Sequence, residues 1–421
     1  MIREKQQKMN ILLLNLLAFF SILSPSVNLP GMPHIRIEHA VGILVILYLL
    51  SKGLLEEKLD VKTYIFPILM ILFALISITS MINGNISGYN IVVNDIFELY
   101  KIFVYVVIFI AVSSLIVHEG EKTKIVKSLN FYIFISNLIA FSQYVNLFNL
   151  NTKYIKYIAP SQQRALMPGY TWPRVVGLSN NPNVYAYIVV IGLVLSLALF
   201  LSTKKKFYVF SMGTNFIALL MTRSRTGFVM FGITVSVFIL IYIVENVFKG
   251  QISLKDKGKW LVGFGALLVI SLIVFLFVLP ESITWRVKEI FNLASVGSWQ
   301  ARIKNWGEYV DYFVKHPIVG IGPVKSIDYI RHPDNEWIML LKRYGLVGTF
   351  YFAFMFIIPI AINWKRLKSS LVGKVFIAVT IGCFVYMIPA IAFHSFQLMS
   401  VTMILAALAL TDTNKSNLES I

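Results

Sequence analysis

The chain has 421 residues, of which 57% are hydrophobic and 14% are charged, and its formal net charge is +18 at pH 7. A soluble domain carries about 25% charged residues, so this composition excludes an ordinary soluble protein and predicts one that crosses a membrane several times. The chain has a single cysteine, Cys383, so it cannot form an intramolecular disulfide. This cysteine lies in an apolar run.

Apolar runs of about 20 residues, long enough to cross a hydrocarbon core about 30 Å thick as helices, recur along nearly the whole sequence. The first follows three basic residues but ends without a convincing small-residue cleavage site, so we expect a retained anchor. The twelve predicted spans are 9–25, 37–54, 63–82, 99–118, 128–147, 183–202, 206–222, 226–248, 260–279, 346–363, 371–393 and 396–411.

Lysine and arginine gather in every alternate connection between these runs, as the positive-inside rule requires of cytoplasmic loops. Both termini are therefore predicted to be cytoplasmic. Because topology explains most of the net charge, the basic balance does not indicate nucleic-acid binding. The residues concerned are Arg3, Lys5, Lys8, Lys52, Lys58, Lys62, Lys122, Lys124, Lys127, Lys204, Lys205, Lys206, Lys249, Lys255, Lys257, Lys259, Lys365, Arg366 and Lys368.

A second group of arginines falls on the opposite side, where the positive-inside rule does not explain it. Arginine holds phosphate or carboxylate through paired hydrogen bonds, so this group favours an anionic, pyrophosphate-bearing substrate. Anchoring to lipid headgroups is the alternative. The group consists of Arg164, Arg174, Arg223, Arg225, Arg286, Arg302, Arg331 and Arg343.

Within this group, Arg223 and Arg225 stand out because they lie in a tight connection between two apolar runs. Ionisable residues at membrane depth are costly and indicate function by default. Arg225 is the stronger candidate, since Arg223 could simply extend its guanidinium to the interface.

The segment Gly177-Leu-Ser-Asn-Asn-Pro-Asn183 precedes the sixth run and has the signature of a helix start. Pro182 suits the first helical position and Asn181 suits the N-cap. Free amides at such a start can also bind anions, so Asn181 and Asn183 are candidates for substrate binding as well as for capping.

Between Leu279 and Leu346 the chain becomes polar and aromatic. The spacing of Arg302, Trp306 and Tyr309 places their side chains on one helical face. Aromatic residues on that face either stack on sugar rings or rest in the lipid headgroup layer, whereas Arg302 is harder to explain without an anionic ligand.

Farther along, His316-Pro317 is expected to end this helix, and the two glycines of residues 318–323 to form a tight turn beneath a ligand. Asp334 is the predicted N-cap of the next helix. Glu336 is expected to complement the dipole of that helix, and His394 to be an interfacial group at a span end.

Five ordered landmarks over residues 177–348 resemble the O-antigen ligase and polymerase family, integral membrane glycosyltransferases with a large outer loop before their last spans. The landmarks are Gly177-Leu-Ser-Asn-Asn-Pro-Asn183, Thr222-Arg-Ser-Arg225, Arg302 with Trp306, His316-Pro-Ile-Val-Gly-Ile-Gly322, and Asp334-Asn-Glu-Trp337 leading to Tyr344-Gly-Leu-Val-Gly348.

The resemblance implies a donor glycan on undecaprenyl pyrophosphate, whose reducing-end sugar is transferred to a hydroxyl group on the outer side of the bacterial cytoplasmic membrane. It also implies a reaction that needs no metal or other cofactor. Arg225 and Arg302 match the essential arginines of the family, which would grip the leaving pyrophosphate. Arg164 and Arg174 are further candidates for guiding the donor or the acceptor.

The ligase signature of the family is a His followed by Asn, Ser or Gln, with two glycines farther on. In this register the chain reads Asp334-Asn335, with Gly345 and Gly348 in place. Either Asp334 or the nearby His332 could therefore act as the base that deprotonates the acceptor hydroxyl. Asn335 remains a candidate for substrate binding.

This departure favours a polymerase, which moves the growing chain onto a new repeat unit, over a ligase, which transfers the finished glycan to lipid A core. A transporter or flippase of lipid-linked sugars is the alternative from another class. It is disfavoured because no halved repeat is found and acidic residues are nearly absent from the predicted spans. Further expected partners are membrane lipid, a flippase and a chain-length regulator, with no nucleic acid.

The expected fold is an all-α integral membrane protein of about twelve spans, similar to GT-C membrane glycosyltransferases, with a large helical outer loop between spans 9 and 10. It divides into residues 1–279 with nine spans, residues 280–345 forming the outer subdomain, and residues 346–421 with three spans and a cytoplasmic tail.

Overall fold

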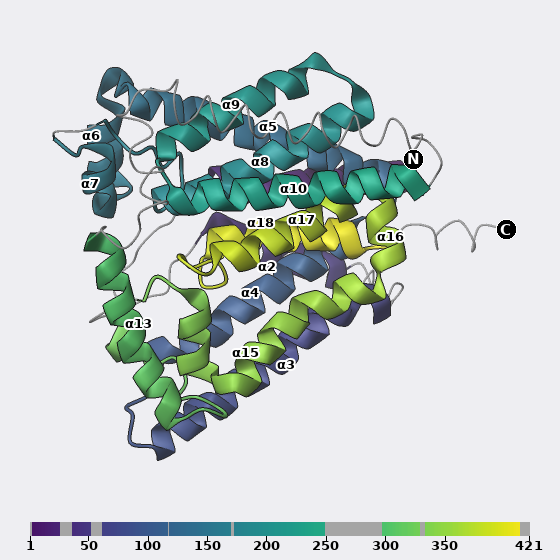
Figure 1. Cartoon of the computed structure of the whole chain (residues 1–421). Coiled ribbons are helices and arrows are strands. Elements are labelled where there is room, and N and C mark those ends of the chain that lie inside the picture. Colours follow the sequence, from purple (N-terminus) through teal and green to yellow (C-terminus); the bar gives the residue numbers. More distant parts are fainter. Residues whose placement is uncertain are drawn as a thin grey trace. The chain divides into compact units, whose positions relative to one another are not determined.

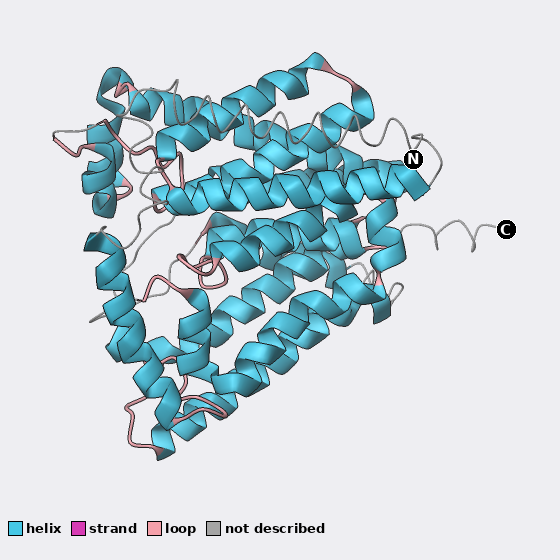
Figure 2. Ribbon diagram, in the orientation of Figure 1, coloured by secondary structure: helices cyan, strands magenta, loops and turns pink. Residues whose placement is uncertain are grey.

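The computed structural model describes residues 2–25, 36–51, 61–116, 118–169, 172–248, 297–328 and 333–412. Every regular element within these ranges is a helix (Figure 2). The predicted span 260–279 and the candidates Arg286, Arg331 and His332 lie outside the described residues, as does the predicted boundary at 279–280.

Among the described residues, seven helices are long and apolar enough to cross a membrane, so the chain is a multi-pass membrane protein. They are α1 (Ile2–Leu23), α3 (Val61–Ile86), α4 (Val93–Leu115), α5 (Glu119–Tyr144), α8 (Pro182–Thr203), α10 (Arg225–Phe248) and α15 (Glu336–Ile362). Shorter apolar helices are α2 (Ile37–Ser51), α17 (Leu371–Tyr386) and α18 (Phe396–Leu410), and α9 (Lys206–Thr222) lies between α8 and α10.

Each predicted apolar run within the described residues coincides with one of these helices, but three helix ends differ in a way that matters. Helix α4 begins at Val93 and helix α15 begins at Glu336, and both starts lie earlier than predicted. Helix α17 ends at Tyr386, which is earlier than the predicted end at residue 393. As a result, Asp95, Glu98 and Glu336 belong to candidate span helices, and the expectation that the spans nearly lack acidic residues is wrong.

The chain divides into two compact units, which we describe separately. Unit 1 comprises Met1–Ser136, Gly297–Trp364 and Tyr386–Ile421. Within it, α15 packs along α3 and α18 packs against α4 (Figure 1). Phe73 of α3 joins Tyr344, Phe352 and Phe393 in an edge-to-face aromatic core. Such contacts favour a fixed packing beyond simple burial.

Unit 1 also contains the polar segment that follows the undescribed residues. Helix α13 (Gly297–Lys315) packs against α15. The short helix α14 (Lys325–Asp328) lies between α13 and α15 in the sequence. His316 follows the last residue of α13 and its amide closes the final turn on Tyr312, which confirms the predicted stop at His316-Pro317.

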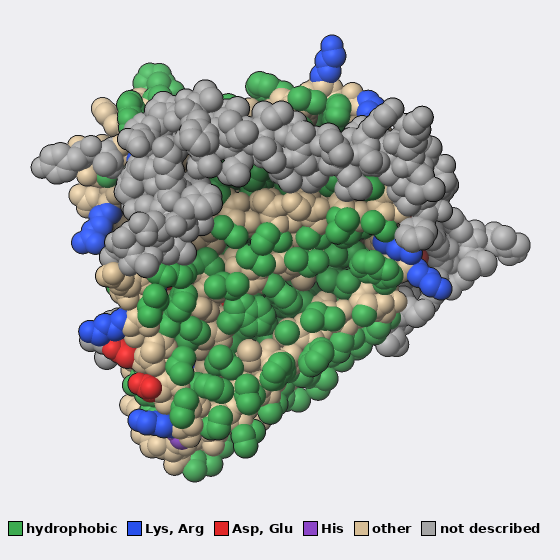
Figure 3. All heavy atoms as spheres, viewed as in Figure 1, with side chains coloured by type: hydrophobic (Ala, Val, Ile, Leu, Met, Phe, Trp, Pro, Cys, Tyr) green, Lys and Arg blue, Asp and Glu red, His purple; other side chains and the backbone are tan. Residues whose placement is uncertain are grey.

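The outer flanks of α3 and α15 remain apolar. On α15, Leu346, Phe350, Phe354 and Ile357 are exposed at helical spacing, and hydrophobic side chains cover this part of the surface in Figure 3. A contiguous exposed apolar surface of this kind suits contact with lipid.

Unit 2 comprises Asn137–Val296 and Lys365–Val385. Helix α8 is at its centre, buried along most of its length, and α9 and α10 pack on it. A helix that is apolar on all sides is expected to be enclosed by others. Between α5 and α8, the chain forms the short helices α6 (Leu150–Tyr157) and α7 (Gln163–Leu166), which enclose a small core of Tyr154, Leu166 and Val176.

Candidate active site

The connection between α9 and α10 in unit 2 presents two arginines within three residues. Arg223 ends α9 in a left-handed conformation with φ 51, and Arg225 is the first residue of α10. Ser224 caps α10, because its hydroxyl oxygen accepts a hydrogen bond from the Gly227 amide at 3.1 Å. The tight turn therefore fixes both arginines beside a helix N-terminus.

Arg174 joins this connection from the segment that precedes α8. Its Nε donates to the carbonyl oxygen of Thr222 at 3.0 Å, and its Nη2 donates to Oδ1 of Asn183 at 3.3 Å. The Ser224 hydroxyl donates to the same Asn183 oxygen at 2.9 Å. Asn183 thus connects Arg174 with the start of α10.

The start of α8 forms as predicted. Asn181 is its N-cap and accepts a hydrogen bond from the Val184 amide at 2.9 Å, and Pro182 occupies the first helical position. Since Asn183 in this first turn contacts Ser224, the N-termini of α8 and α10 lie close together. Helix N-termini carry free amides and partial positive charge.

The segment before α8 is fastened to unit 2 by a buried glutamine. Gln143 accepts a hydrogen bond from the Val176 amide at 3.1 Å and donates one to the carbonyl oxygen of Gly177 at 2.8 Å. The Val175 amide donates to the carbonyl oxygen of Met221 at 3.2 Å. These bonds fix the backbone on both sides of the contact between Arg174 and the α9–α10 connection.

The guanidinium of Arg223 is the most enclosed of the three, with 4% of the residue exposed. Burial lowers the pKa of Arg223 below its ordinary value, and a contact with the Tyr144 hydroxyl opposes that shift. A nearby anion would favour the charged form further. Arg174, Arg223 and Arg225 thus gather at the connection that begins α10, close to the N-terminus of α8.

Arg164 is placed differently from the other candidates of unit 2. It is exposed on α7, although the amide of Arg174 donates to the carbonyl oxygen of its neighbour Ala165 at 2.8 Å. The structure brings Arg174, Arg223 and Arg225 to one connection and leaves Arg164 at the surface.

Unit 1 holds the second group of predicted site residues. Nε of Arg302 lies 3.3 Å from Oδ2 of Asp334. The Asp334 side chain is 52% exposed, whereas that of Arg302 is 21% exposed. The two candidates from α13 and from the start of α15 thus form an ion pair at the surface of the unit, where a substrate could reach the carboxylate.

Trp306 and Tyr309 on the same face of α13 pack inward. The Trp306 indole donates to the carbonyl oxygen of Pro333 at 2.6 Å, and Tyr309 is buried with Lys342 of α15 above its ring. The indole N–H of Trp306 is thus engaged by the protein, and stacking on sugar rings or contact with headgroups stays a prediction for this face.

The N-cap of α15 was wrongly predicted. It is Asn335, whose side-chain oxygen accepts a hydrogen bond from the Ile338 amide at 3.0 Å. Asp334 precedes it with φ 49, and its carboxylate faces Arg302 instead of the helix amides. Asparagine caps a helix as well as aspartate does, so the residue types alone do not separate these two neighbours.

The glycines of residues 318–323 let this loop pack closely against α15 and Met81, and a ligand above it stays a prediction. Gly345 interrupts α15 with φ 61 and ψ −163, and the loop fills the gap. The amides of Ile321 and Gly322 donate to the carbonyl oxygens of Lys342 and Arg343, at 3.1 and 2.8 Å. A Cβ on Gly322 would lie 2.9 Å from the Cα of Met81.

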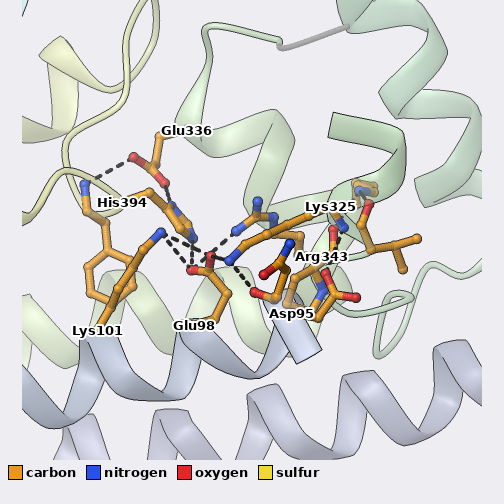
Figure 4. A network of polar contacts seen from close by, with 12 residues as sticks. Asp95, Glu98, Lys101, Lys325, Glu336, Arg343 and His394 are labelled. Atoms are coloured by element: carbon orange, nitrogen blue, oxygen red, sulfur yellow. Dashed lines mark hydrogen bonds and ion pairs between the residues drawn. The ribbon is translucent and has the colours of Figure 1, made fainter. Parts of the chain in front are cut away.

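A buried charge network in unit 1 was not identified from the sequence (Figure 4). His394, expected at the interface, has both ring nitrogens beside carboxylates, those of Glu336 and Glu98. Glu336 is fully buried and does more than complement a helix dipole. The only signal in the sequence was the presence of charged residues near apolar runs. No local pattern indicates that residues so far apart in the sequence pair with one another. Its members are Asp95, Glu98, Lys101, Lys325, Glu336, Arg343 and His394.

Within the described ranges, no group of three or more His, Cys, Asp and Glu side chains has an arrangement that could hold a metal ion.

Comparison with known proteins connects the two groups of candidates to one family. Residues 210–353 match the family model described as O-Antigen ligase (Wzy_C). The match includes Arg223, Arg225, Arg302, Asp334 and Asn335, and confirms the resemblance to the O-antigen ligase and polymerase family. No curated protein matches the chain.

Proposed function

On the premise that this chain carries an O-antigen ligase family domain, we propose that it is a membrane glycosyltransferase that polymerises oligosaccharide repeat units linked to undecaprenyl pyrophosphate. The product would be an O-antigen or capsular-type polysaccharide, made on the outer face of the bacterial cytoplasmic membrane. The observation that carries the proposal is the convergence of Arg174, Arg223 and Arg225 with the N-termini of α8 and α10.

Such a site suits the departing group of the reaction. When the bond between the sugar C1 and the phosphate oxygen breaks, negative charge develops on undecaprenyl pyrophosphate. Guanidinium groups and helix amides that are already in place stabilise this charge without reorganisation. Cleavage of the glycosyl phosphate bond of the donor supplies the driving force. We assign Arg225 the central role, with Arg174 and Arg223 as binding residues.

For the acceptor, Asp334 is the proposed base. Its carboxylate is exposed and lies against Arg302, so it is placed to accept the proton of the attacking hydroxyl. That hydroxyl belongs to the non-reducing end of a new repeat unit, and its oxygen forms the new glycosidic bond.

Transfer to lipid A core is the second candidate function, because the matching family model is described as a ligase. The same arginines would serve it, since donor and leaving group are identical. The two functions differ only in the acceptor. The substitution of Asp334 for the signature His favours the polymerase.

The test uses the purified full chain in lipid, supplied with an undecaprenyl-pyrophosphate repeat unit alone, with glycan lengths resolved on a gel. A polymerase gives a ladder with the wild type and none with Arg225→Ala. Lys153→Ala, which removes an exposed cation of α6 in the same unit, should preserve the ladder. Transfer only after lipid A core is added would establish the ligase, and no transfer to either acceptor would refute both proposals.

A further inference from the structure

The buried charge network of unit 1 joins four chain segments. Its residues come from the first turns of α4, from the start of α14, from both ends of the first half of α15, and from the loop between α17 and α18 (Figure 4). Burial of this many charges is costly unless each is paired. Such a network holds its segments in one arrangement, because removing one partner leaves another charge buried alone.

Glu98 is the centre of the network, with 2% of the residue exposed. Its Oε1 lies 3.0 Å from Nζ of Lys101 and 3.0 Å from Nζ of Lys325. Its Oε2 lies 3.1 Å from Nε2 of His394 and 3.5 Å from Nη1 of Arg343. One carboxylate of α4 thus holds α14, α15 and the α17–α18 loop.

Glu336 fixes the start of α15 to the α17–α18 loop. One carboxylate oxygen accepts hydrogen bonds from the amides of Ala392 and Phe393, at 2.8 and 3.0 Å. The other bonds to Nδ1 of His394. The Glu336 amide donates to the carbonyl oxygen of Met387 at 2.9 Å. The first residue of α15 is therefore held through both its backbone and its side chain.

His394 does not itself have the geometry of a catalytic base. Both ring nitrogens face carboxylate oxygens, and its side chain is 6% exposed. A base must reach the proton that it removes. The histidine instead connects Glu336 with Glu98, and any effect on the reaction passes through these neighbours.

The first half of α15 needs such anchors because it is separated from the second half. The amides of Leu346 and Val347 donate to the carbonyl oxygens of Pro317 and Ile318. The hydrogen bonds of the α-helix are therefore interrupted at Gly345. Asp334 stands two residues before Glu336, with φ 49. Aspartate tolerates this left-handed conformation, and its two neighbours are held, Pro333 by the Trp306 indole and Asn335 by the cap of α15. Glu336 in turn fixes the helix turn to which that cap belongs.

We infer that Glu98, His394 and Glu336 are positioning residues that hold the start of α15 so that the Asp334 carboxylate faces Arg302 and the acceptor hydroxyl. The inference rests on the function proposed above. These residues do not touch the substrate. They orient the Asp334 carboxylate, which does touch the substrate.

The first experiment compares the rate of repeat addition by Glu98→Gln and by the wild type in the reconstituted system. A misplacement of about 1 Å can cost about 100-fold in rate, so we expect kcat to fall by at least about tenfold with little change in the KM for the donor. His394→Asn, which keeps an amide donor close to Glu336 but loses the contact with Glu98, should act in the same direction and serves if Glu98→Gln does not fold.

The matched control is Glu245→Gln. Glu245 is also a buried glutamate paired with a lysine, Lys374, but this pair belongs to unit 2. Glu245→Gln should lower the stability of the protein without a selective loss of kcat. An equal loss of kcat in Glu98→Gln and Glu245→Gln would overturn the inference.

A second readout does not depend on catalysis. Amide hydrogen exchange in Glu98→Gln should accelerate at residues 335–344 and remain slow at residues 350–362. Faster exchange throughout the chain, or no change at 335–344, would overturn the inference. If the wild type makes no polymer, the proposed function fails, whereas the exchange result still decides whether the network fixes the start of α15.

Discussion

Two asparagines show how a single residue type performs different tasks in this protein. Asn335 gives its side-chain oxygen to the helix amide of Ile338, whereas Asn183 gives its oxygen to Arg174 and Ser224. Both oxygens thus accept hydrogen bonds from the protein. A role of either residue in substrate binding stays a prediction.

Replacing Asn335 by Ala should lower the free energy of unfolding by about 1 kcal/mol, because α15 loses its N-cap. Asn335→Ser should retain most of that stability, since a serine hydroxyl also caps a helix. The midpoints of thermal unfolding in detergent would measure both. Equal midpoints for Asn335→Ala and wild type would show that Asp334 or another group replaces the cap.

Arg225→Lys tests whether the site needs a guanidinium or only a positive charge. Lysine is a point charge and cannot form two parallel hydrogen bonds to a phosphate. We therefore expect transfer by Arg225→Lys to remain at least about tenfold below wild type, a loss of about 1.4 kcal/mol in transition-state stabilisation. Near-normal kinetics of the lysine variant would mean that Arg225 provides charge alone.

At the scale of elements, the interruption of α15 is the feature that the sequence pattern concealed. Hydropathy continues through Gly345, yet the helix breaks there and the 317–323 loop supplies the missing hydrogen bonds. Gly320, Gly322 and Gly345 all have positive φ. Glycine is needed at Gly345 because its conformation is essentially closed to other residues.

Gly345→Ala should therefore destabilise the protein by about 1–3 kcal/mol, the cost of a strained backbone, with more from the contact of its Cβ at 2.4 Å from the carbonyl oxygen of Ile318. Gly307→Ala is the matched control. Gly307 is exposed within α13 with open space around it, so this change should stabilise by about 0.5–1 kcal/mol. Thermal unfolding of the two variants should shift in opposite directions, and a shared direction would contradict this account.

For the whole molecule, the membrane orientation is predicted from charge alone. The alternation of basic loops predicts that the α8–α9 connection is cytoplasmic and that the segment between α5 and α8 is outside. In a Cys383→Ala background, Thr152→Cys should react with an impermeant maleimide in intact cells. Lys204→Cys should react only after the membrane is opened. Both positions are exposed, and the reverse labelling pattern would invert the predicted topology.

The sequence was sufficient for the membrane class, for the positions of the apolar helices within the described residues and for the cap at Asn181. Each depends on interactions within a window of a few turns, where hydropathy and helix capping act. The family resemblance also singled out Arg225, Arg302 and Asp334 as candidates, because motif spacing is a local property.

Only the tertiary structure decided how distant groups combine. Arg174 meets Asn183 and Thr222 in unit 2, and His394 joins Glu336 to Glu98 in unit 1. Neither arrangement could be predicted from the sequence, because charges and hydrogen bonds pair by proximity in space and leave no periodic signal along the chain. For the same reason, the sequence predicted that a cap begins α15 but assigned it to Asp334 instead of Asn335.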